Sequence, residues 1–283
     1  MRISISRLTV SLGVSAVVAS VLLPHSPRFS EASAIGVRPP AAQAGVPAAQ
    51  AGGQAVQTGG QGVQAGAQLV QPGVAALQAD AAAARRARLL DPAAPAFAAP
   101  APARSIVRLE TTRGNVDIEV TRQWAPRGAD RFVNLVRHGY YDDTRFFRLR
   151  PGRFVQFGVN GDPAVAQAWR KATFPDDPFR ESNVRGTVAF AFAVPNGRTT
   201  QVFVNLADNA TTYDAEPFVP FGRVVAGMDL LEALNAAHGE GPGGIRAGGQ
   251  DPFFEGGNAW LDVLYPGLDA IRRARILSET KPG

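Results

Sequence analysis

The amino-acid composition changes abruptly near residue 104, and this change confines a globular core to the last part of the chain. Between Ile35 and Ala103, Ala, Gly, Gln, Pro and Val dominate, and Phe97 is the only aromatic residue. A segment with so few large apolar side chains cannot bury enough surface to offset the entropy lost on ordering. We therefore expect one folded domain over 104–283, preceded by a disordered low-complexity linker over 35–103.

A seven-residue repeat runs through this linker. Gln recurs at 43, 50, 57, 64, 71 and 78, and Gly recurs at 45, 52, 59, 66 and 73. The spacing fits a coiled-coil heptad, but each Gly disfavours a helix by about 1 kcal/mol relative to Ala. We interpret the repeat as a flexible tether, with Ala-rich helical propensity over Val74–Leu90.

Residues 1–34 have the three parts of a secretory signal peptide. Met1–Arg7 carries two Arg, Leu8–Leu23 is an uncharged apolar run, and Ala32-Ser33-Ala34 matches a small-residue cleavage site. We expect an exported protein, in the periplasm or elsewhere outside the cytoplasm. If the segment stays uncut it would anchor the chain in the inner membrane, and only then do we expect contact with a membrane.

Composition excludes several chemistries. The chain has no Cys, and its three His, at 25, 138 and 238, are far apart in sequence, so we expect no metal site. The net charge of +5 divides into +4 for residues 1–100, with 7 Arg and 3 acidic residues, and +1 for the rest, with 22 basic and 21 acidic. Without a dense basic patch we expect no nucleic-acid partner.

Alternation of apolar residues between turn signals predicts a mainly β domain. A hairpin is predicted over Ser105–Thr111 and Asn115–Val120, and a helix from Pro126 to Gly139. Further strands are predicted over Thr187–Phe192, Gln201–Leu206, Phe218–Val225 and Ile271–Leu277, and further helices over Met228–Ala237 and Ala259–Tyr265. The Gly-rich stretch from 239 to 257 is interpreted as a mobile loop, although it contains a G-x-G-x-x-G match, because it follows a helix.

The stretch from Arg145 to Gly161 reads as two strands around a Pro-Gly turn. In a continuous strand Phe146 and Arg148 share one face, and Phe147 and Leu149 share the other. Arg148 is therefore a charge among aromatic residues. Two interpretations are open from these residues alone. Either Arg148 forms the wall of an apolar pocket, or its guanidinium extends out to water.

Several segments, taken in order, resemble the cyclophilin-type peptidyl-prolyl isomerases. The segments that carry the resemblance are Phe146–Gly158, Gly186–Asn205 and Pro220–Asp229, and the similarity covers roughly 105–277. The resemblance implies a closed antiparallel eight-stranded barrel capped by two α-helices. It also implies isomerisation of Xaa-Pro bonds without a cofactor, on proline-containing polypeptides, by a protein that we expect to be a monomer.

The same resemblance implies roles for particular residues. Arg148 corresponds to the catalytic Arg of the family and Gln156 to the Gln that lines the site. The proline pocket corresponds to Phe154, Ala191, Phe203, Tyr213 and Phe218.

Two departures from the family pattern leave two functions open. Arg153 stands where the family usually has a pocket Phe, and Asp214 replaces an apolar residue. The first hypothesis is a peptidyl-prolyl isomerase that assists the folding of exported proteins. The alternative is a cyclophilin-like module that binds proline peptides with weak or no catalysis.

Overall fold

The computed structural model describes residues 61–243 and 249–280, and for 61–73 it describes the backbone alone. Those residues lie in one compact unit of the chain, Gly59–Gly283. The predicted signal peptide, and the linker as far as residue 60, fall outside the described residues.

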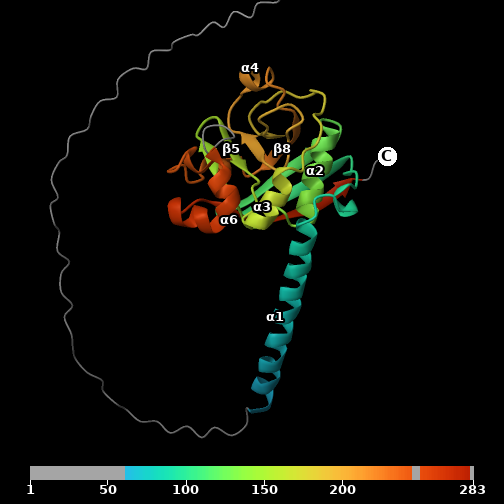
Figure 1. Ribbon diagram of the computed structural model, residues 1–283, viewed down its shortest axis with the longest axis vertical. Helices are drawn as coiled ribbons and strands as arrows, with labels where there is room; N and C mark the ends of the chain where they lie inside the picture. The colour runs from blue at the N-terminus through green and yellow to red at the C-terminus, as the bar shows by residue number, and fades with distance from the viewer. Residues whose placement is uncertain (1–60, 244–248, 281–283) are drawn as a thin grey trace, which may run out of the picture. The chain divides into compact units, whose positions relative to one another are not determined.

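One antiparallel sheet of nine strands forms the frame of the domain (Figure 1). Its strands lie in the order β3-β9-β1-β2-β8-β6-β7-β5-β4. Their bounds are β1 Arg104–Thr111, β2 Gly114–Thr121, β3 Thr144–Arg145, β4 Arg148–Arg150, β5 Phe154–Phe157, β6 Thr187–Phe190, β7 Val202–Asn205, β8 Pro220–Ala226 and β9 Ala270–Thr280. The mainly β prediction is therefore confirmed, as are the hairpin of β1 with β2 and the closing strand β9.

The prediction of a closed eight-stranded barrel is wrong in strand number and in closure. The sheet has nine strands, and no ladder joins its edge strands β3 and β4 in the described part of the chain. Only Phe146 and Phe147 separate these two strands in sequence, so their nearest Cα atoms lie within about 11 Å of each other. The sheet must therefore curl until β3 and β4 come near one another, although no ladder in the described residues pairs these two strands.

The break between β3 and β4 also overturns the predicted alternation of side chains. Phe146 and Leu149 both belong to the main core, whereas Phe147 packs in a separate cluster against Phe253. A continuous strand would place Phe146 and Leu149 on opposite faces. Because the segment is two short strands paired with different partners, its faces do not alternate through the break, and Arg148 lies at the first position of β4.

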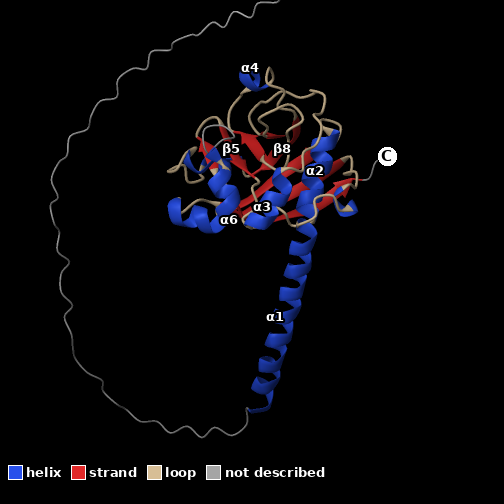
Figure 2. Ribbon diagram, viewed as in Figure 1, coloured by secondary structure: helices blue, strands red, loops and turns tan. Residues whose placement is uncertain are grey.

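Six α-helices accompany the sheet in the described residues, rather than two. They are α1 Gln61–Leu89, α2 Pro126–Arg137, α3 Pro163–Arg170, α4 Ala210–Tyr213, α5 Met228–Glu232 and α6 Asp251–Leu264. In the view of Figure 2, α2, α3 and α6 lie in front of the strands, and α2 contacts β9, β8 and β1. The helix predicted from Pro126 is confirmed, and it ends before Gly139, which has a left-handed φ of 71°.

Two of the other helices differ from the prediction for identifiable reasons. The helix α5 ends at Glu232, short of the predicted Ala237, because the backbone N–H of Asn235 donates instead to the Asp269 carboxylate at 2.7 Å. The helix α3 was not predicted. Its start is marked by Asp162, whose side chain accepts from the N–H groups of Ala164 and Val165, followed by Pro163 at the first helical position.

The helix α6 occupies the last seven residues of the predicted mobile loop over 239–257 and continues through the predicted helix over Ala259–Tyr265 as far as Leu264. It begins at Asp251, with Pro252 in its first turn, and buries Phe253, Phe254 and Leu261. Residues 244–248 of the predicted loop fall outside the described residues. The helix thus forms a small core of its own with Phe147.

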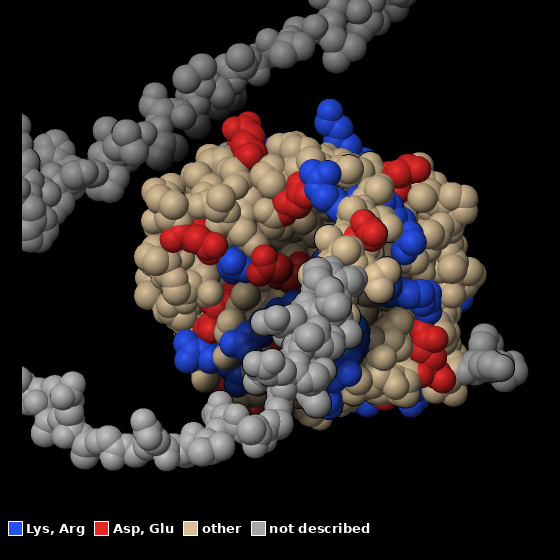
Figure 3. All heavy atoms as spheres, turned by 90° about the horizontal axis from the view of Figure 1, so that it is seen from below, with Lys and Arg blue, Asp and Glu red and all other residues tan. Residues whose placement is uncertain are grey.

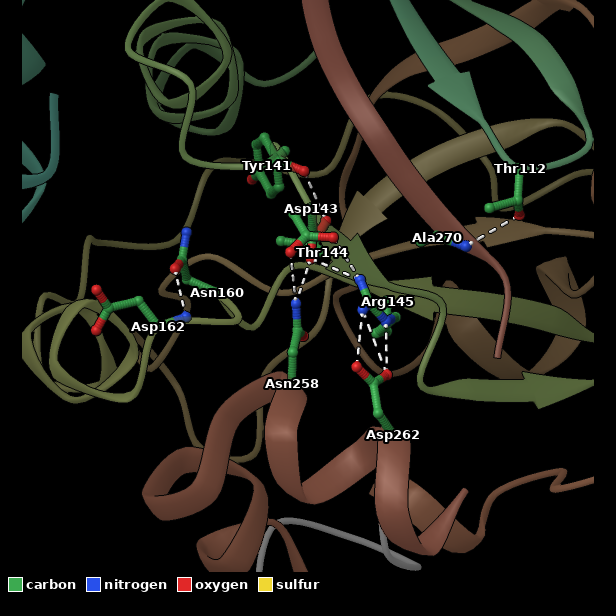
Figure 4. Close-up of polar contacts among 10 residues, drawn as sticks. All are labelled: Thr112, Tyr141, Asp143, Thr144, Arg145, Asn160, Asp162, Asn258, Asp262 and Ala270. Carbon is green, nitrogen blue, oxygen red and sulfur yellow. Dashed lines mark hydrogen bonds and ion pairs between the residues drawn. The ribbon is translucent and has the colours of Figure 1, made fainter. Parts of the chain in front are cut away.

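Polar contacts fasten α6 to the β3 edge of the sheet (Figure 4). The Asn258 amide donates to the backbone carbonyl of Asp143 at 2.8 Å and to its carboxylate at 3.0 Å. Arg145 bridges Asp143 and Asp262, with shortest nitrogen–oxygen distances of 2.6 and 3.2 Å. These contacts support Asp143 in a left-handed conformation, φ 58°, which only a few residue types adopt readily.

The segment before β1 packs on the domain, which differs from the prediction of disorder up to residue 103. The helix α1 continues from the predicted Val74–Leu90 back to Gln61. Leu89 is buried at 4% exposure, and its carbonyl accepts from the indole of Trp169 at 2.7 Å. Phe97 contacts the same indole edge-to-face, with ring centroids 4.8 Å apart. One end of α1 and the following turn therefore belong to the packed structure.

Ion pairs strengthen this attachment. Arg85 pairs with Asp142 and Arg86 with Asp162, each at 2.5 Å. Figure 3 shows the face of the molecule seen from below, where basic and acidic side chains lie interspersed. Exposed pairs of this kind contribute little individually, about 0–1 kcal/mol, so the burial of Leu89 is the larger stabilising term.

None of the helices in the described ranges combines the length and apolarity that a membrane crossing requires.

Substituting Leu89 by Ala tests whether this segment is part of the fold. Removing a buried Leu side chain costs about 2–5 kcal/mol of unfolding free energy, whereas Leu77, at 71% exposure on the same helix, provides a matched control. We expect Leu89→Ala to lower the denaturant midpoint clearly and Leu77→Ala to leave it unchanged within error. Equal effects of the two substitutions in urea unfolding would contradict the packing described.

Candidate active site

A cavity of about 460 Å³ lies against the β4 edge of the sheet. Strands β4, β5 and β7 supply one wall, and the segments around residues 191–193 and 213–218 supply the others. It is lined by Arg148, Arg150, Phe154, Gln156, Ala191, Phe192, Ala193, Phe203, Tyr213, Glu216 and Phe218.

Strand register places the central polar and aromatic residues of this cavity in one row. Arg148 is paired with Gln156, and Gln156 with Phe203, across the antiparallel ladders β4–β5 and β5–β7. Directly opposed residues of an antiparallel pair project from the same face of the sheet. Phe154 precedes Gln156 by two residues and shares that face.

Aromatic rings form the apolar part of the cavity. The ring centroid of Phe203 lies 6.2 Å from that of Phe154, 5.6 Å from Tyr213 and 5.3 Å from Phe218, all in edge-to-face arrangements. Phe154 and Phe203 are buried, and Ala191, Tyr213 and Phe218 are partly exposed around them. The result is a concave apolar receptacle, of a kind that suits a small ring.

Arg148 lies at the edge of this receptacle and is held by three groups. Its Cζ atom lies 4.7 Å from the ring centroid of Phe154, and Nη1 donates to Oε1 of Gln156 at 3.2 Å. Nη2 pairs with Oε1 of Glu240 at 2.5 Å. The guanidinium has five N–H donors, so these two bonds leave others that can meet a bound molecule.

Two further amides extend the polar row beyond the cavity. Gln156 donates to Gln201 at 2.7 Å, and Gln201 donates to Gln250 at 2.8 Å, at the N-terminal end of α6. Each amide thereby holds the next in one orientation. Arg148 is thus linked through three glutamines to the helix that lies beyond the sheet edge.

A smaller cavity of about 210 Å³ adjoins the first. The two share Arg148, Gln156 and the segment 191–193, and the smaller one is also lined by Arg170, Gly197, Thr199, Gln201, Gln250 and Phe254. A chain-like ligand that fills the larger cavity can therefore extend past Arg148 into a second, more polar space.

Arg198 supports the wall of the cavity from behind. Its side chain is 3% exposed, pairs with Asp176 and donates to the carbonyl of Pro217. Its Cζ lies 4.3 Å from the ring centroid of Phe192, one of the lining residues. Burial lowers the pKa of Arg198 to about 10, so the side chain is still charged at neutral pH.

The two departures from the family pattern have structural roles. Arg153 stacks on Tyr213, with Cζ 5.7 Å from the ring centroid, and its carbonyl accepts from Asn209 at 2.8 Å. Asp214 accepts from the backbone and side-chain nitrogens of Asn183 at 2.8 and 2.9 Å. Neither residue is among those that line the larger cavity.

The structure brings all seven residues predicted for the site to the lining of the larger cavity, although their roles remain a prediction. Sequence reasoning missed the participation of Phe192, Gln201 and Glu240. Gln201 could have been found, because it alternates with Phe203 on a predicted strand. Glu240 gave no such signal, since a lone acid in a Gly-rich stretch does not indicate its partner.

Comparisons with known proteins show the family to which the chain belongs. The model of the family "Cyclophilin type peptidyl-prolyl cis-trans isomerase/CLD" matches residues 106–246. The chain is 33% identical to peptidyl-prolyl cis-trans isomerase A of Dickeya dadantii, over 53% of this chain and 80% of that protein. It is 32% identical to a peptidyl-prolyl cis-trans isomerase of Acinetobacter baylyi, over 47% of this chain and 72% of that protein.

The chain therefore belongs to the cyclophilin-type peptidyl-prolyl cis-trans isomerase family, and its enzyme class is that of the isomerases. Among solved structures, a cyclophilin-type isomerase of Cryptosporidium parvum aligns with a TM-score of 0.44 and 19% identity, over 62% of this chain and 99% of that one. Some relatives carry other names, such as the spliceosome-associated protein CWC27 homolog of Xenopus laevis, 37% identical over 37% of this chain and 23% of that protein.

Proposed function

We propose that the larger cavity binds the ring of a substrate proline and that Arg148 promotes rotation about the preceding peptide bond. One observation carries the proposal: the guanidinium of Arg148 and the ring of Phe203, the centre of the aromatic cup, lie in the same cross-strand row and line the same cavity. The aromatic cup suits an apolar ring, and the guanidinium faces the position where the polar peptide bond next to that ring would lie.

The barrier to this reaction comes from amide resonance. Rotation about a peptide bond must overcome about 18–20 kcal/mol, and no proton transfer or covalent step is required. An enzyme accelerates the rotation only by binding the twisted bond more tightly than either planar form. The site must therefore hold the ring still and offer a group that interacts better with the twisted amide.

Arg148 supplies such a group. In the twisted amide the prolyl nitrogen regains a lone pair, and a permanently charged guanidinium can donate a hydrogen bond toward it. A charge-assisted bond contributes roughly 1.5–3 kcal/mol, which corresponds to about one to two decades of rate. The bond from Arg148 to Gln156 and the contact with Phe154 keep the guanidinium in place.

The alternative function is a module that binds proline peptides with weak or no catalysis. Arg153 and Asp214 were the residues that favoured it at the level of sequence. In the structure neither residue lines the larger cavity: Arg153 stacks on Tyr213, and Asp214 accepts from Asn183. They therefore give this alternative no support, and a direct assay of isomerisation separates the two functions.

Substituting Arg148 by Ala tests the proposed mechanism. We expect kcat/KM for an Xaa-Pro peptide to fall by about 10- to 100-fold, because the donor toward the prolyl nitrogen is lost. The measurement is a protease-coupled isomerisation assay, with circular dichroism to show that the variant is folded. Arg272→Ala is the matched control, since it removes the same charge from an exposed position on β9 outside the cavity lining. Turnover of Arg148→Ala equal to that of the wild type would sink the mechanism.

We further propose that the enzyme is exported and assists the folding of exported proteins. The charged start, apolar run and small-residue site within residues 1–34 support export, and slow Xaa-Pro rotation limits the folding of many chains. N-terminal sequencing of the protein recovered from an expressing bacterium should give a chain that begins at Ile35. A chain that begins at Met1 and sediments with membranes would favour an uncleaved anchor instead.

A further inference from the structure

Glu240 is the one acidic residue bonded to Arg148 in the described part of the chain, and the backbone around it is firmly held. The N–H of Leu149, in β4, donates to the carbonyl of Gly239 at 2.9 Å. The N–H of Gly241 donates to the carbonyl of His238 at 2.9 Å. The turn that carries Glu240 is thus tied to the strand that carries Arg148.

Packing fixes the other side of the same turn. Pro242 and Gly243 are buried. A Cβ atom on Gly243 would lie 2.9 Å from the ring of Phe147 and 3.2 Å from Cβ of Arg148, so the backbone approaches β4 as closely as a glycine allows. The position of Glu240 beside Arg148 therefore follows from the fold rather than from a chance contact of two long side chains.

The ion pair lies at the border of the cavity. The Arg148 and Glu240 side chains are 23% and 25% exposed, and the shortest distance between them is 2.5 Å. Solvent screens charges at this exposure only in part. A substrate group that enters the cavity beside Arg148 therefore meets the field of both charges.

The charges that line the two cavities show what Glu240 changes. The larger cavity is lined by two basic residues, Arg148 and Arg150, and one acidic residue, Glu216. The smaller cavity is also lined by Arg170, whose charge is paired with that of Asp251. Without Glu240 the cleft would carry an excess of positive charge and attract carboxylates. With Glu240, the charge of Arg148 is offset where the peptide has to pass.

We propose that Glu240 is a specificity-determining residue that disfavours substrates with an acidic residue next to the proline. A substrate carboxylate that approaches Arg148 is repelled by the Glu240 carboxylate beside it, and one that took the place of Glu240 would leave a half-buried carboxylate without a partner. Neutral and basic neighbours leave the pair intact, and a basic one is attracted by Glu240. This inference rests on the proposed function, because it assumes that the proline ring enters the larger cavity.

The test uses Glu240→Gln in the full-length protein and three peptides that differ only in one residue flanking the proline, Glu, Gln or Lys. Two sets place that residue before or after the proline. For the wild type we expect the lowest kcat/KM with the Glu peptide. In Glu240→Gln we expect the Glu-to-Gln ratio of kcat/KM to rise about three- to fivefold in at least one set, in line with a partly exposed pair. The Lys-to-Gln ratio should fall, and 0.5 M NaCl should shrink both shifts.

Glu255→Gln is the matched control, because it removes the same charge from an exposed position on α6. We expect its ratios to equal those of the wild type. If Glu240→Gln changes all three peptides by one common factor, or leaves both ratios unchanged in both sets, the proposal is overturned.

The Arg148→Ala variant separates this outcome from failure of the proposed function. Full turnover of Arg148→Ala would overturn the catalytic role of Arg148 and the inference together. Loss of turnover in Arg148→Ala, with unchanged ratios in Glu240→Gln, would overturn the specificity role of Glu240 alone.

Discussion

The antiparallel register of β4, β5 and β7 is the constraint on which the site depends. It sets Arg148, Gln156 and Phe203 in one row on one face of the sheet. A slip of one residue between strands would turn these side chains to the opposite face. The register is secured by what lies on the other side: Leu149, Val155 and Val204 are buried in the main core. The same packing that stabilises the domain therefore aims the polar row at the cavity.

The break before β4 gives Arg148 its particular surroundings. Phe147 leaves the main core and packs with Phe253 of α6, and this brings α6 and the turn at Glu240 beside the sheet edge. Arg148 donates to the first of three hydrogen-bonded glutamine amides, and the last of them is Gln250, at the start of α6. The region before β9 that holds Glu240 and Gln250 thus supplies contacts that orient the proposed catalytic group and set its electrostatic environment.

Much of the fold could be predicted from the sequence, because its signals were local. On the strand predicted over Gln201–Leu206, Phe203 lies at the cavity while Val202 and Val204 lie in the core, as the alternation of side chains along a strand requires. The residues that the family resemblance assigned to the pocket also meet at one cavity. What could not be predicted depends on distant partners. The docking of Leu89 requires Trp169, and the role of Glu240 requires Arg148, 92 residues away. The predicted closure of the sheet was wrong. Phe146 and Phe147 separate β3 from β4, and nothing in these two apolar residues indicates that a strand is interrupted there.

The central claim is that Arg148 acts on the twisted peptide bond and not merely on binding. Exchange NMR on a proline peptide with catalytic amounts of Arg148→Lys tests this most directly, since Lys keeps the charge but not the planar array of donors. The account predicts that exchange between the cis and trans signals slows strongly, while a separate titration of the variant with the peptide still gives the protein shift changes caused by binding. Exchange as fast as with the wild-type protein would contradict it.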